Sequence, residues 1–254
     1  MMLLAAVVLT VDGLDHERSG LLPWLADGTK NASSDPEVGH DPFALGTDTG
    51  SGCAQGTNPD QGLRIEIGND GMTLGPVETD ATWQVGIELR RIHRGKGALT
   101  PFDRSAWRST DSTLTIDHGT YAIEYINNSD GLRQNFIVRE EPPGDGPLQV
   151  ELRPQGDLEC VHAGHDAFHF VDTDNVIRMR YADLHVWDAQ GDTLEAFAEL
   201  VEGSIVLTAL DADAVYPITV DPLASTAIWT TESNLNNAQL GTSVSSAGDV
   251  NGDG

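Results

Sequence analysis

Apolar and polar residues alternate in short runs along the chain between residues 62 and 222. Successive side chains of a β-strand point to opposite faces, so this alternation predicts strands that each bury one face. The runs cover residues 63–67, 72–74, 83–89, 114–116, 121–126, 134–138, 148–152, 184–187, 205–207 and 216–220. Many short strands at regular spacing predict an all-β fold, with an antiparallel β-sandwich-like domain over residues 61–222.

Turn-forming residues separate the alternating runs. Asn69-Asp70-Gly71 lies between two of them and predicts a hairpin, because Asp-Gly tolerates the positive φ of tight turns. Similar clusters occupy residues 127–131 and 142–146. The best helix candidate is a short segment near Thr193–Leu200.

The first 60 residues lack this alternation. Met1–Leu9 is an apolar run, too short to span a bilayer, that resembles the middle of a secretory signal peptide. It has no basic region and no clear cleavage site, so the alternatives are a truncated signal, which we favour, and a first β-strand. Residues 27–60 are rich in Gly, Ser, Thr, Asp and Pro, which predicts a linker or a poorly ordered segment. Since no other stretch is long and apolar enough, we expect no membrane insertion of the mature chain.

Charge narrows the classes of partner. The chain of 254 residues carries 40 acidic against 14 basic residues, a formal net charge of −26, and its only lysines are Lys30 and Lys96. Nucleic acids and anionic membranes are bound through Lys and Arg contacts to phosphate, so we expect no nucleic-acid partner. The composition fits an exported protein in salty surroundings, a divalent-cation binder, or an acidic surface with no partner.

Cys53 and Cys160 are the only two cysteines. In an exported protein they can pair, and closing so long a loop would stabilise the fold by about 4–5 kcal/mol in the chain-entropy model. Two unpaired thiols are an equal alternative at this stage.

The last six residues place oxygen-bearing side chains at alternate positions, Asp249, Asn251 and Asp253, and then turn on Gly254. Ca²⁺ takes six to eight oxygen ligands, and alternate residues converge on one ion only where the chain coils tightly. No helical periodicity precedes Asp249, which excludes an EF-hand. The sequence stops before any seventh- or ninth-position ligand, so we expect half a site and interpret the chain as a fragment.

Leu240-Gly241 and the stretch Ser246-Ala247-Gly248-Asp249-Val250-Asn251-Gly252-Asp253-Gly254 closely resemble the opening of an FG-GAP repeat, the blade unit of integrin-alpha-type β-propellers. Leu240 stands where the family usually has Phe. The resemblance implies that residues 223–254 begin a propeller blade. It also implies that Asp249, Asn251 and Asp253 bind a structural Ca²⁺, weakly in this chain, with later ligands beyond Gly254.

The upstream region resembles, more loosely, the β-rich domain that precedes such repeats in large bacterial surface proteins. The matching stretches are residues 131–138, 184–191 and 213–222. This second resemblance provides no catalytic residues to transfer.

Two further motifs bear on chemistry. Asp48-Thr49-Gly50-Ser51 spells an aspartic-protease signature, but that chemistry needs two carboxylates and no second Asp-Thr-Gly occurs. Cys160, His162, His165 and His169 are a possible zinc set, although the run 168–171 reads as a strand that turns His169 away from the others. We therefore favour a linker for the first motif and exposed loop histidines for the second.

Aromatic residues offer one more alternative. Trp83, Trp107, Trp187 and Tyr181 could form a sugar-binding platform, but in alternating strands such residues are more often part of the core.

The sequence therefore predicts a non-enzymatic exported protein, extracellular or at the cell surface, with calcium-binding repeats that serve adhesion or the binding of an unknown protein or carbohydrate ligand. The alternative is an accessory β module of a secreted hydrolase whose catalytic domain lies downstream. A third possibility is a structural spacer that binds only calcium.

Overall fold

Each alternating run forms or overlaps a β-strand in the computed structural model, which describes residues 41–48, 52–78, 82–101 and 105–226. All of these residues belong to one compact unit that spans residues 39–254. The described residues contain strands and turns and no helix, so the predicted all-β class is confirmed.

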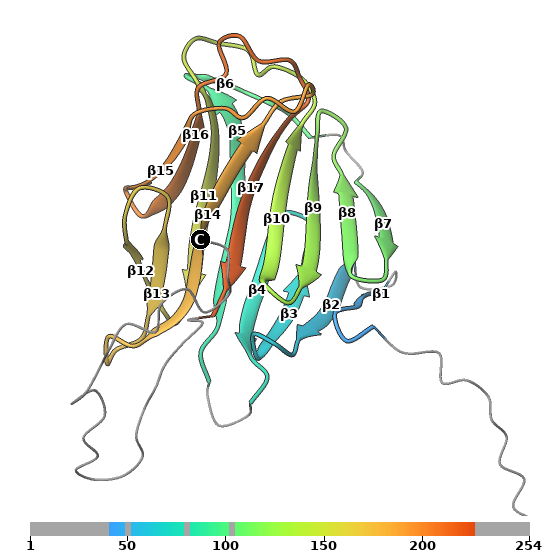
Figure 1. The fold of residues 1–254 in the computed structure, drawn as a ribbon, viewed down its shortest axis with the longest axis vertical. Helices are drawn as coiled ribbons and strands as arrows, with labels where there is room; N and C mark the ends of the chain where they lie inside the picture. The colour runs from blue at the N-terminus through green and yellow to red at the C-terminus, as the bar shows by residue number, and fades with distance from the viewer. Residues whose placement is uncertain (1–40, 49–51, 79–81, 102–104, 227–254) are drawn as a thin grey trace, which may run out of the picture. The chain divides into compact units, whose positions relative to one another are not determined.

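The strands form two antiparallel sheets (Figure 1). In spatial order, sheet A consists of β1 (Leu45–Asp48), β2 (Cys53–Asn58), β3 (Leu63–Ile67), β4 (Gly71–Pro76), β5 (Val85–Arg94), β11 (Leu148–Gly156), β16 (Ser204–Ala209) and β15 (Ala196–Val201), and the short β6 (Gly97–Ala98) pairs with β5. Sheet B consists of β12 (Glu159–His162), β13 (Phe168–Val171), β14 (Ile177–Trp187), β17 (Ile218–Ser225), β10 (Gly131–Val138), β9 (Tyr121–Asn128), β8 (Thr113–Asp117) and β7 (Ala106–Thr110).

One hydrophobic core joins the inner faces of the two sheets. Along β3, for example, Leu63, Ile65 and Ile67 are fully buried, while Arg64 and Glu66 between them are exposed. Burial of each large apolar side chain contributes about 1.5–3 kcal/mol. The predicted period of two therefore places one face of each strand in the core and leaves the other outside.

A polar group also lies inside this core and is satisfied there. The Gln134 side chain accepts a hydrogen bond from the Tyr181 hydroxyl at 2.8 Å and donates one to the Tyr125 hydroxyl at 3.1 Å. Each of the three side chains is at least 99 % buried. Because an unpaired buried polar group costs about 1–3 kcal/mol, this chain of bonds allows aromatic residues with polar ends to fill the core.

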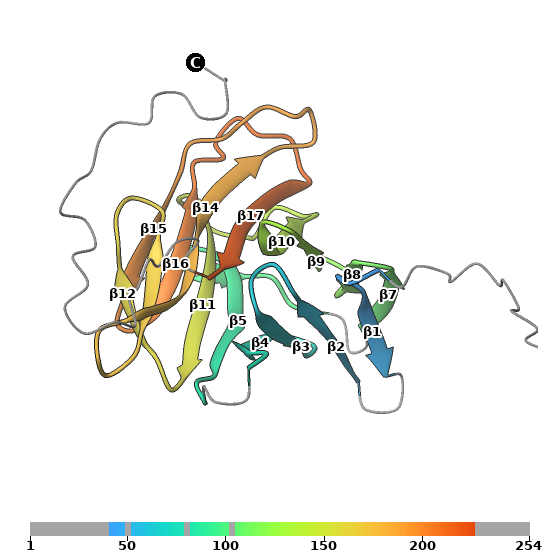
Figure 2. The same ribbon diagram turned by 60° about the horizontal axis from the view of Figure 1, so that its bottom comes forward.

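The two sheets are connected at both lateral sides, where β1 lies near β7 and β15 lies near β12 (Figure 2). On one side the Leu45 amide donates to the Asp111 carbonyl at 2.8 Å, and on the other the Ala198 amide donates to the His165 carbonyl at 3.2 Å. Edge strands with open backbone groups invite pairing with other chains, and these contacts partly cover two of the edges.

The structure differs from the sequence interpretation in the predicted linker. Strands β1 and β2 lie within residues 27–60 and pair with each other and with β3. These strands are rich in glycine and polar residues and therefore show little alternation. At the other boundary, β17 continues three residues beyond Pro222, to Ser225. The predicted start of a propeller blade otherwise lies outside the described residues.

Two local predictions were also wrong. The segment near Thr193–Leu200 is not a helix: Thr193 forms an isolated bridge with Trp187, and residues from Ala196 onward form β15. Pairing with β16 overrides the helix preference of Ala, Glu and Leu there. The hairpin at residues 69–71 is present, but Gly71 does not have the positive φ that we expected. Glycine is required there because a Cβ would lie 2.3 Å from the Ile87 carbonyl oxygen.

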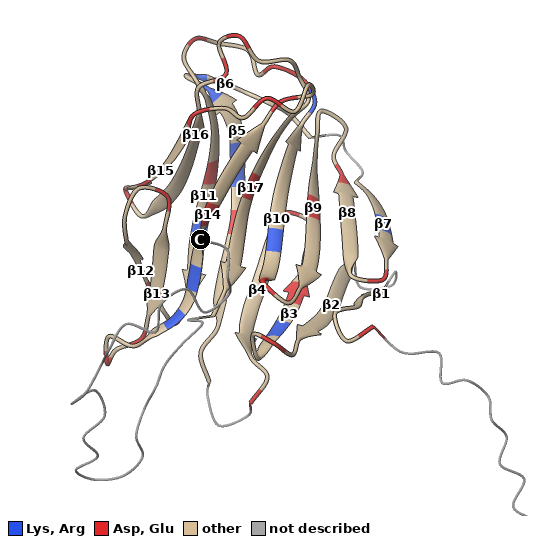
Figure 3. Ribbon diagram, in the orientation of Figure 1, with Lys and Arg blue, Asp and Glu red and all other residues tan. Residues whose placement is uncertain are grey.

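Charged residues are distributed unevenly over the strands and loops (Figure 3). Several arginines of the strands bind carboxylates on a neighbouring strand, as Arg91 does with Glu151 at 2.6 Å and Arg153 with Glu88 at 2.5 Å. Acidic residues outnumber basic ones by 40 to 14 in the whole chain, so these pairs use basic side chains that are scarce.

Candidate functional site

The predicted calcium ligands Asp249, Asn251 and Asp253 lie outside the described residues, which end at Thr226. The calcium loop therefore stays a prediction from the sequence. Within the described ranges, no group of three or more His, Cys, Asp or Glu side chains has an arrangement that could hold a metal ion.

The possible zinc set does not come together. Cys160 and His162 lie on β12 opposite Phe170 and Phe168, on the side of sheet B that faces the core. His169 alternates with those phenylalanines on β13 and therefore points to the outer face, opposite Arg180 of β14. The strand over residues 168–171 that separates these ligands was predicted from the sequence and is confirmed.

Cys53 and Cys160 do not form a disulfide with each other. They lie on β2 of sheet A and β12 of sheet B, near opposite lateral sides of the sandwich. Desolvation raises the pKa of the half-buried Cys160 thiol to about 12, so this thiol is protonated and a poor nucleophile at neutral pH.

The aromatic residues considered for a sugar platform are divided between the core and an outer face. Tyr181 is fully buried, and Trp83 and Trp107 pack against the core. Trp187 lies on the outer face of sheet B, where it pairs with Thr219 of β17. Asp48, the one described residue of the protease-like motif, ends β1 opposite Cys53.

A hollow of about 460 Å³ opens on the outer face of sheet A. Gly71 and Gly86 form its floor on β4 and β5, and the side chains of Glu66, Glu88 and Gln155 stand around them. Glu88 accepts hydrogen bonds from Arg153 and Gln155, both at 2.5 Å, and the Arg153 bond is the main cause that lowers the pKa of this carboxyl. The hollow therefore presents carboxylate and amide groups.

Glycine occupies the two floor positions, 71 and 86, for different physical reasons. Gly71 has no room for a side chain, whereas a Cβ at Gly86 would meet its nearest atom, Cβ of Gln155, at an ordinary 3.6 Å. Neither backbone conformation nor crowding requires glycine at position 86, and its missing side chain leaves the hollow open. A glycine inside an alternating run, as in residues 83–89, is the sequence signal for this feature, and our reading of the sequence did not use it.

A second, larger hollow of about 890 Å³ lies over β1, β2 and β3. Its lining includes Asp41, Gly46, Gln55 and Thr57, and it shares Glu66 with the first hollow. Glu66 thus borders both hollows on one sheet face, and Arg64 lines the second one. Much of this lining belongs to the segment that the sequence predicted as a linker.

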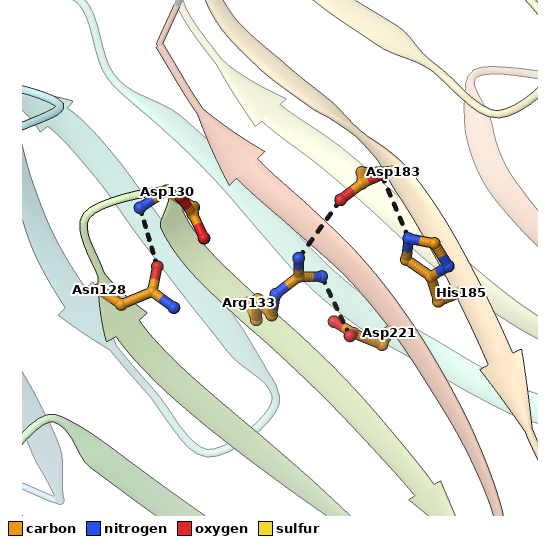
Figure 4. A network of polar contacts seen from close by, with 6 residues as sticks. All are labelled: Asn128, Asp130, Arg133, Asp183, His185 and Asp221. Atoms are coloured by element: carbon orange, nitrogen blue, oxygen red, sulfur yellow. Dashed lines mark hydrogen bonds and ion pairs between the residues drawn. The ribbon is translucent and has the colours of Figure 1, made fainter. Parts of the chain in front are cut away.

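A row of charged side chains crosses the outer face of sheet B (Figure 4). The Arg133 guanidinium on β10 lies between two carboxylates and donates to Asp221 of β17 at 3.0 Å and to Asp183 of β14 at 3.3 Å. His185 lies 3.2 Å from the other side of Asp183. Asp183 adopts φ of 56° at a bulge between β14 and β17, which brings its carboxylate within reach of Arg133.

A buried ion pair connects three segments at one end of the sandwich. Arg94, at the end of β5, donates to the carboxylate of Asp211, which also accepts from the Tyr216 hydroxyl at 2.6 Å and from the Leu148 amide at 3.0 Å. Burial raises the pKa of Tyr216, so its hydroxyl stays a donor. Asp211 is only 4 % exposed, and this group therefore holds the fold together instead of facing solvent.

No helix among the described residues is long and apolar enough to cross a membrane. Comparison with protein-family models, with curated proteins and with solved structures gives no match to this chain.

Proposed function

We propose that this chain is part of a non-enzymatic exported protein of the cell surface, in which the β-sandwich precedes a calcium-binding repeat of the FG-GAP type. The observation that carries the proposal is the spacing of Asp249, Asn251 and Asp253 with Gly254 behind them. Oxygen ligands at alternate positions followed by a glycine provide half of a Ca²⁺ shell from one short loop.

The charge of the chain supports an exported cation binder. A formal net charge of −26 attracts divalent cations and repels nucleic acid and anionic lipid. In the proposed role the ion is structural: it joins carboxylates that would otherwise repel one another and fixes the loop that leads into the next strand.

The two hollows of sheet A support a role in binding a protein or carbohydrate ligand. They lie side by side on one outer face, they are open, and carboxylate, amide and hydroxyl groups line them. Small-molecule sites enclose most of their ligand, whereas both hollows are open, so the proposed ligand is an extended surface, not a deeply buried small molecule.

The calcium claim is tested by titrating the 254-residue chain with CaCl₂ and following backbone amide resonances by NMR. We expect the signals of Gly252 and Gly254 to shift with a Kd in the millimolar range, on the order of the weakest calcium modules, because water completes the shell. The Asp249→Ala variant should abolish these shifts. Asp213→Ala, which removes an exposed carboxylate of the sandwich, is the matched control and should leave them unchanged.

Equal shifts in the wild type and in Asp249→Ala would contradict the proposal. An equal response to CaCl₂ and to NaCl at the same ionic strength would also contradict it. The second outcome would mean that the loop responds to ionic strength and holds no ion.

A further inference from the structure

Two buried oxygen atoms on the outer face of sheet B have no hydrogen-bond partner, Oδ1 of Asn135 and Oδ1 of Asp221. The two residues are 5 % and 7 % exposed, respectively. A buried acceptor without a donor costs about 1–3 kcal/mol, so two such oxygens in one place need a physical reason.

The register of the sheet places the two residues opposite each other. Strand β10 pairs Phe136 with Val220 and Arg133 with Leu223 of β17, which sets Asn135 opposite Asp221. On its other side, Asn135 is opposite Glu124 of β9. Glu124, Asn135 and Asp221 therefore form a row across three neighbouring strands, and side chains directly opposite in this way have Cβ atoms about 4.5–5.5 Å apart.

The hydrogen bonds in this row lack one donor hydrogen, between Asn135 and Asp221. The Asn135 amide donates from Nδ2 to Oε1 of Glu124 at 3.1 Å, which turns its Oδ1 toward β17. Oδ2 of Asp221 accepts from Arg133, which leaves Oδ1 of Asp221 for Asn135. Each of the two residues then has only an acceptor oxygen left for the other, and turning the amide over would only move the same conflict to Glu124.

We propose that Asp221 is a proton-binding site, in which Oδ1 carries a hydrogen and donates it to Oδ1 of Asn135. The carboxylate takes up one proton from solvent and becomes a carboxylic acid, while its Oδ2 continues to accept from Arg133. The charge of the Arg133 guanidinium is then balanced by Asp183, its second carboxylate partner.

The surrounding groups are consistent with this assignment. Three charged or titratable side chains act on Asp221 directly, namely Arg133, Asp183 and His185. Glu124 lies beyond Asn135, on β9. Burial raises the pKa of Asp221 above its ordinary value in spite of the attraction of Arg133. Asp183 adds to the rise by repulsion, and a protonated His185 would oppose it.

The sign of the effect on stability follows from the raised pKa. Because the folded protein binds this proton more tightly than the unfolded chain, the contribution is fully present below the ordinary Asp pKa of about 3.9. It is lost as the pH rises through the folded pKa of Asp221. An ordinary ion pair with Arg133 would have the opposite dependence.

The test is urea unfolding of the wild type and of Asp221→Asn between pH 4 and pH 8. Asparagine is neutral, donates to Asn135 from its amide and still accepts from Arg133. We therefore expect the unfolding equilibrium constant of the wild type, divided by that of the variant, to increase with pH by up to about tenfold per pH unit until Asp221 is ionised. A ratio that stays constant or falls as the pH rises would overturn the proposal.

A matched control is Asp172→Asn, which removes a carboxylate bound by Arg178 at 2.7 Å. Backbone donors and Arg178 lower the pKa of Asp172, so its ratio should be flat above about pH 5, since the ordinary value is about 3.9. If Asp221→Asn does not fold, the side-chain carboxyl carbon of Asp221 in the unaltered chain is titrated by ¹³C NMR. A midpoint above the ordinary value supports the proposal, and one at or below it overturns it.

Discussion

Asn127 provides the sharpest test of how the sandwich is held together. This residue of β9 in sheet B is 1 % exposed and reaches across to the first strands of sheet A. Its Nδ2 donates to the carbonyls of Phe43 at 2.8 Å and Thr57 at 2.9 Å, and its Oδ1 accepts from the Asn58 side chain at 2.8 Å. Asn127→Ala removes all three bonds.

The size of the loss follows from that count. A hydrogen bond contributes about 1 kcal/mol net, so three bonds give a loss of about 3 kcal/mol, or roughly a hundredfold in the unfolding equilibrium constant. Asn58→Ala removes one of the same bonds, so the losses of the two variants should not add. We expect the loss of unfolding free energy in the double variant to be smaller than the sum of the two single losses by about 1 kcal/mol.

Urea unfolding measures these losses, and hydrogen exchange of the amides in residues 41–58 shows where they act. The control is Asn128→Ala, because the side chain of this neighbour accepts only an exposed bond from the Asp130 amide at 2.9 Å. A loss below about 0.5 kcal/mol for Asn127→Ala, with unchanged exchange in residues 41–58, would refute the reasoning, since surface substitutions have effects of that size. It would mean that β1 and β2 do not depend on this link.

Two further predictions follow from individual contacts. Gly71→Ala should lower the free energy of unfolding by more than about 2 kcal/mol, because its Cβ would overlap the Ile87 carbonyl. Gly86→Ala should change the free energy of unfolding by less than about 1 kcal/mol, because its Cβ would make only ordinary contacts, the nearest at 3.6 Å. Equal losses in urea unfolding would contradict this difference between the two glycines. His118 is buried and bonded through Nε2 to the Asn69 carbonyl at 3.1 Å, and burial lowers its pKa. The folded protein favours the neutral form, so the contribution of His118 to stability is fully present above the ordinary His pKa of about 6.5 and decreases as the pH falls below it. His118→Gln should therefore reduce the dependence of the melting temperature on pH between pH 5 and pH 7. An unchanged slope would contradict this role.

The strands could be predicted from the sequence wherever side chains of opposite polarity alternate. Leu63, Ile65 and Ile67 of β3 are such a case, because the pattern itself states which face is buried. Strands β1 and β2 could not be found in this way. Gly56 of β2, for example, is a glycine because a Cβ would lie 2.7 Å from the Ala44 carbonyl oxygen, a constraint that exists only once the two strands are paired.

The order of the strands within each sheet could not be predicted either. Strand β5 pairs with β11, and β10 pairs with β17, and these partners are far apart in the sequence. The row of Glu124, Asn135 and Asp221 depends on the register of β9, β10 and the distant β17, so no local pattern indicates it. The acidic loop at residues 249–253 is the reverse case. Its ligands lie close together in the sequence, which is why it could be proposed from spacing alone.

The positions of the first and last described strands have a mechanical consequence. A tensile load along the chain would enter through β1, which is four residues long and, among the described strands, has a ladder partner along one side only, β2. It would leave through β17, which is eight residues long and is held on both flanks by β10 and β14. Rupture should therefore begin by peeling β1 away, and the core around β17 should outlast it.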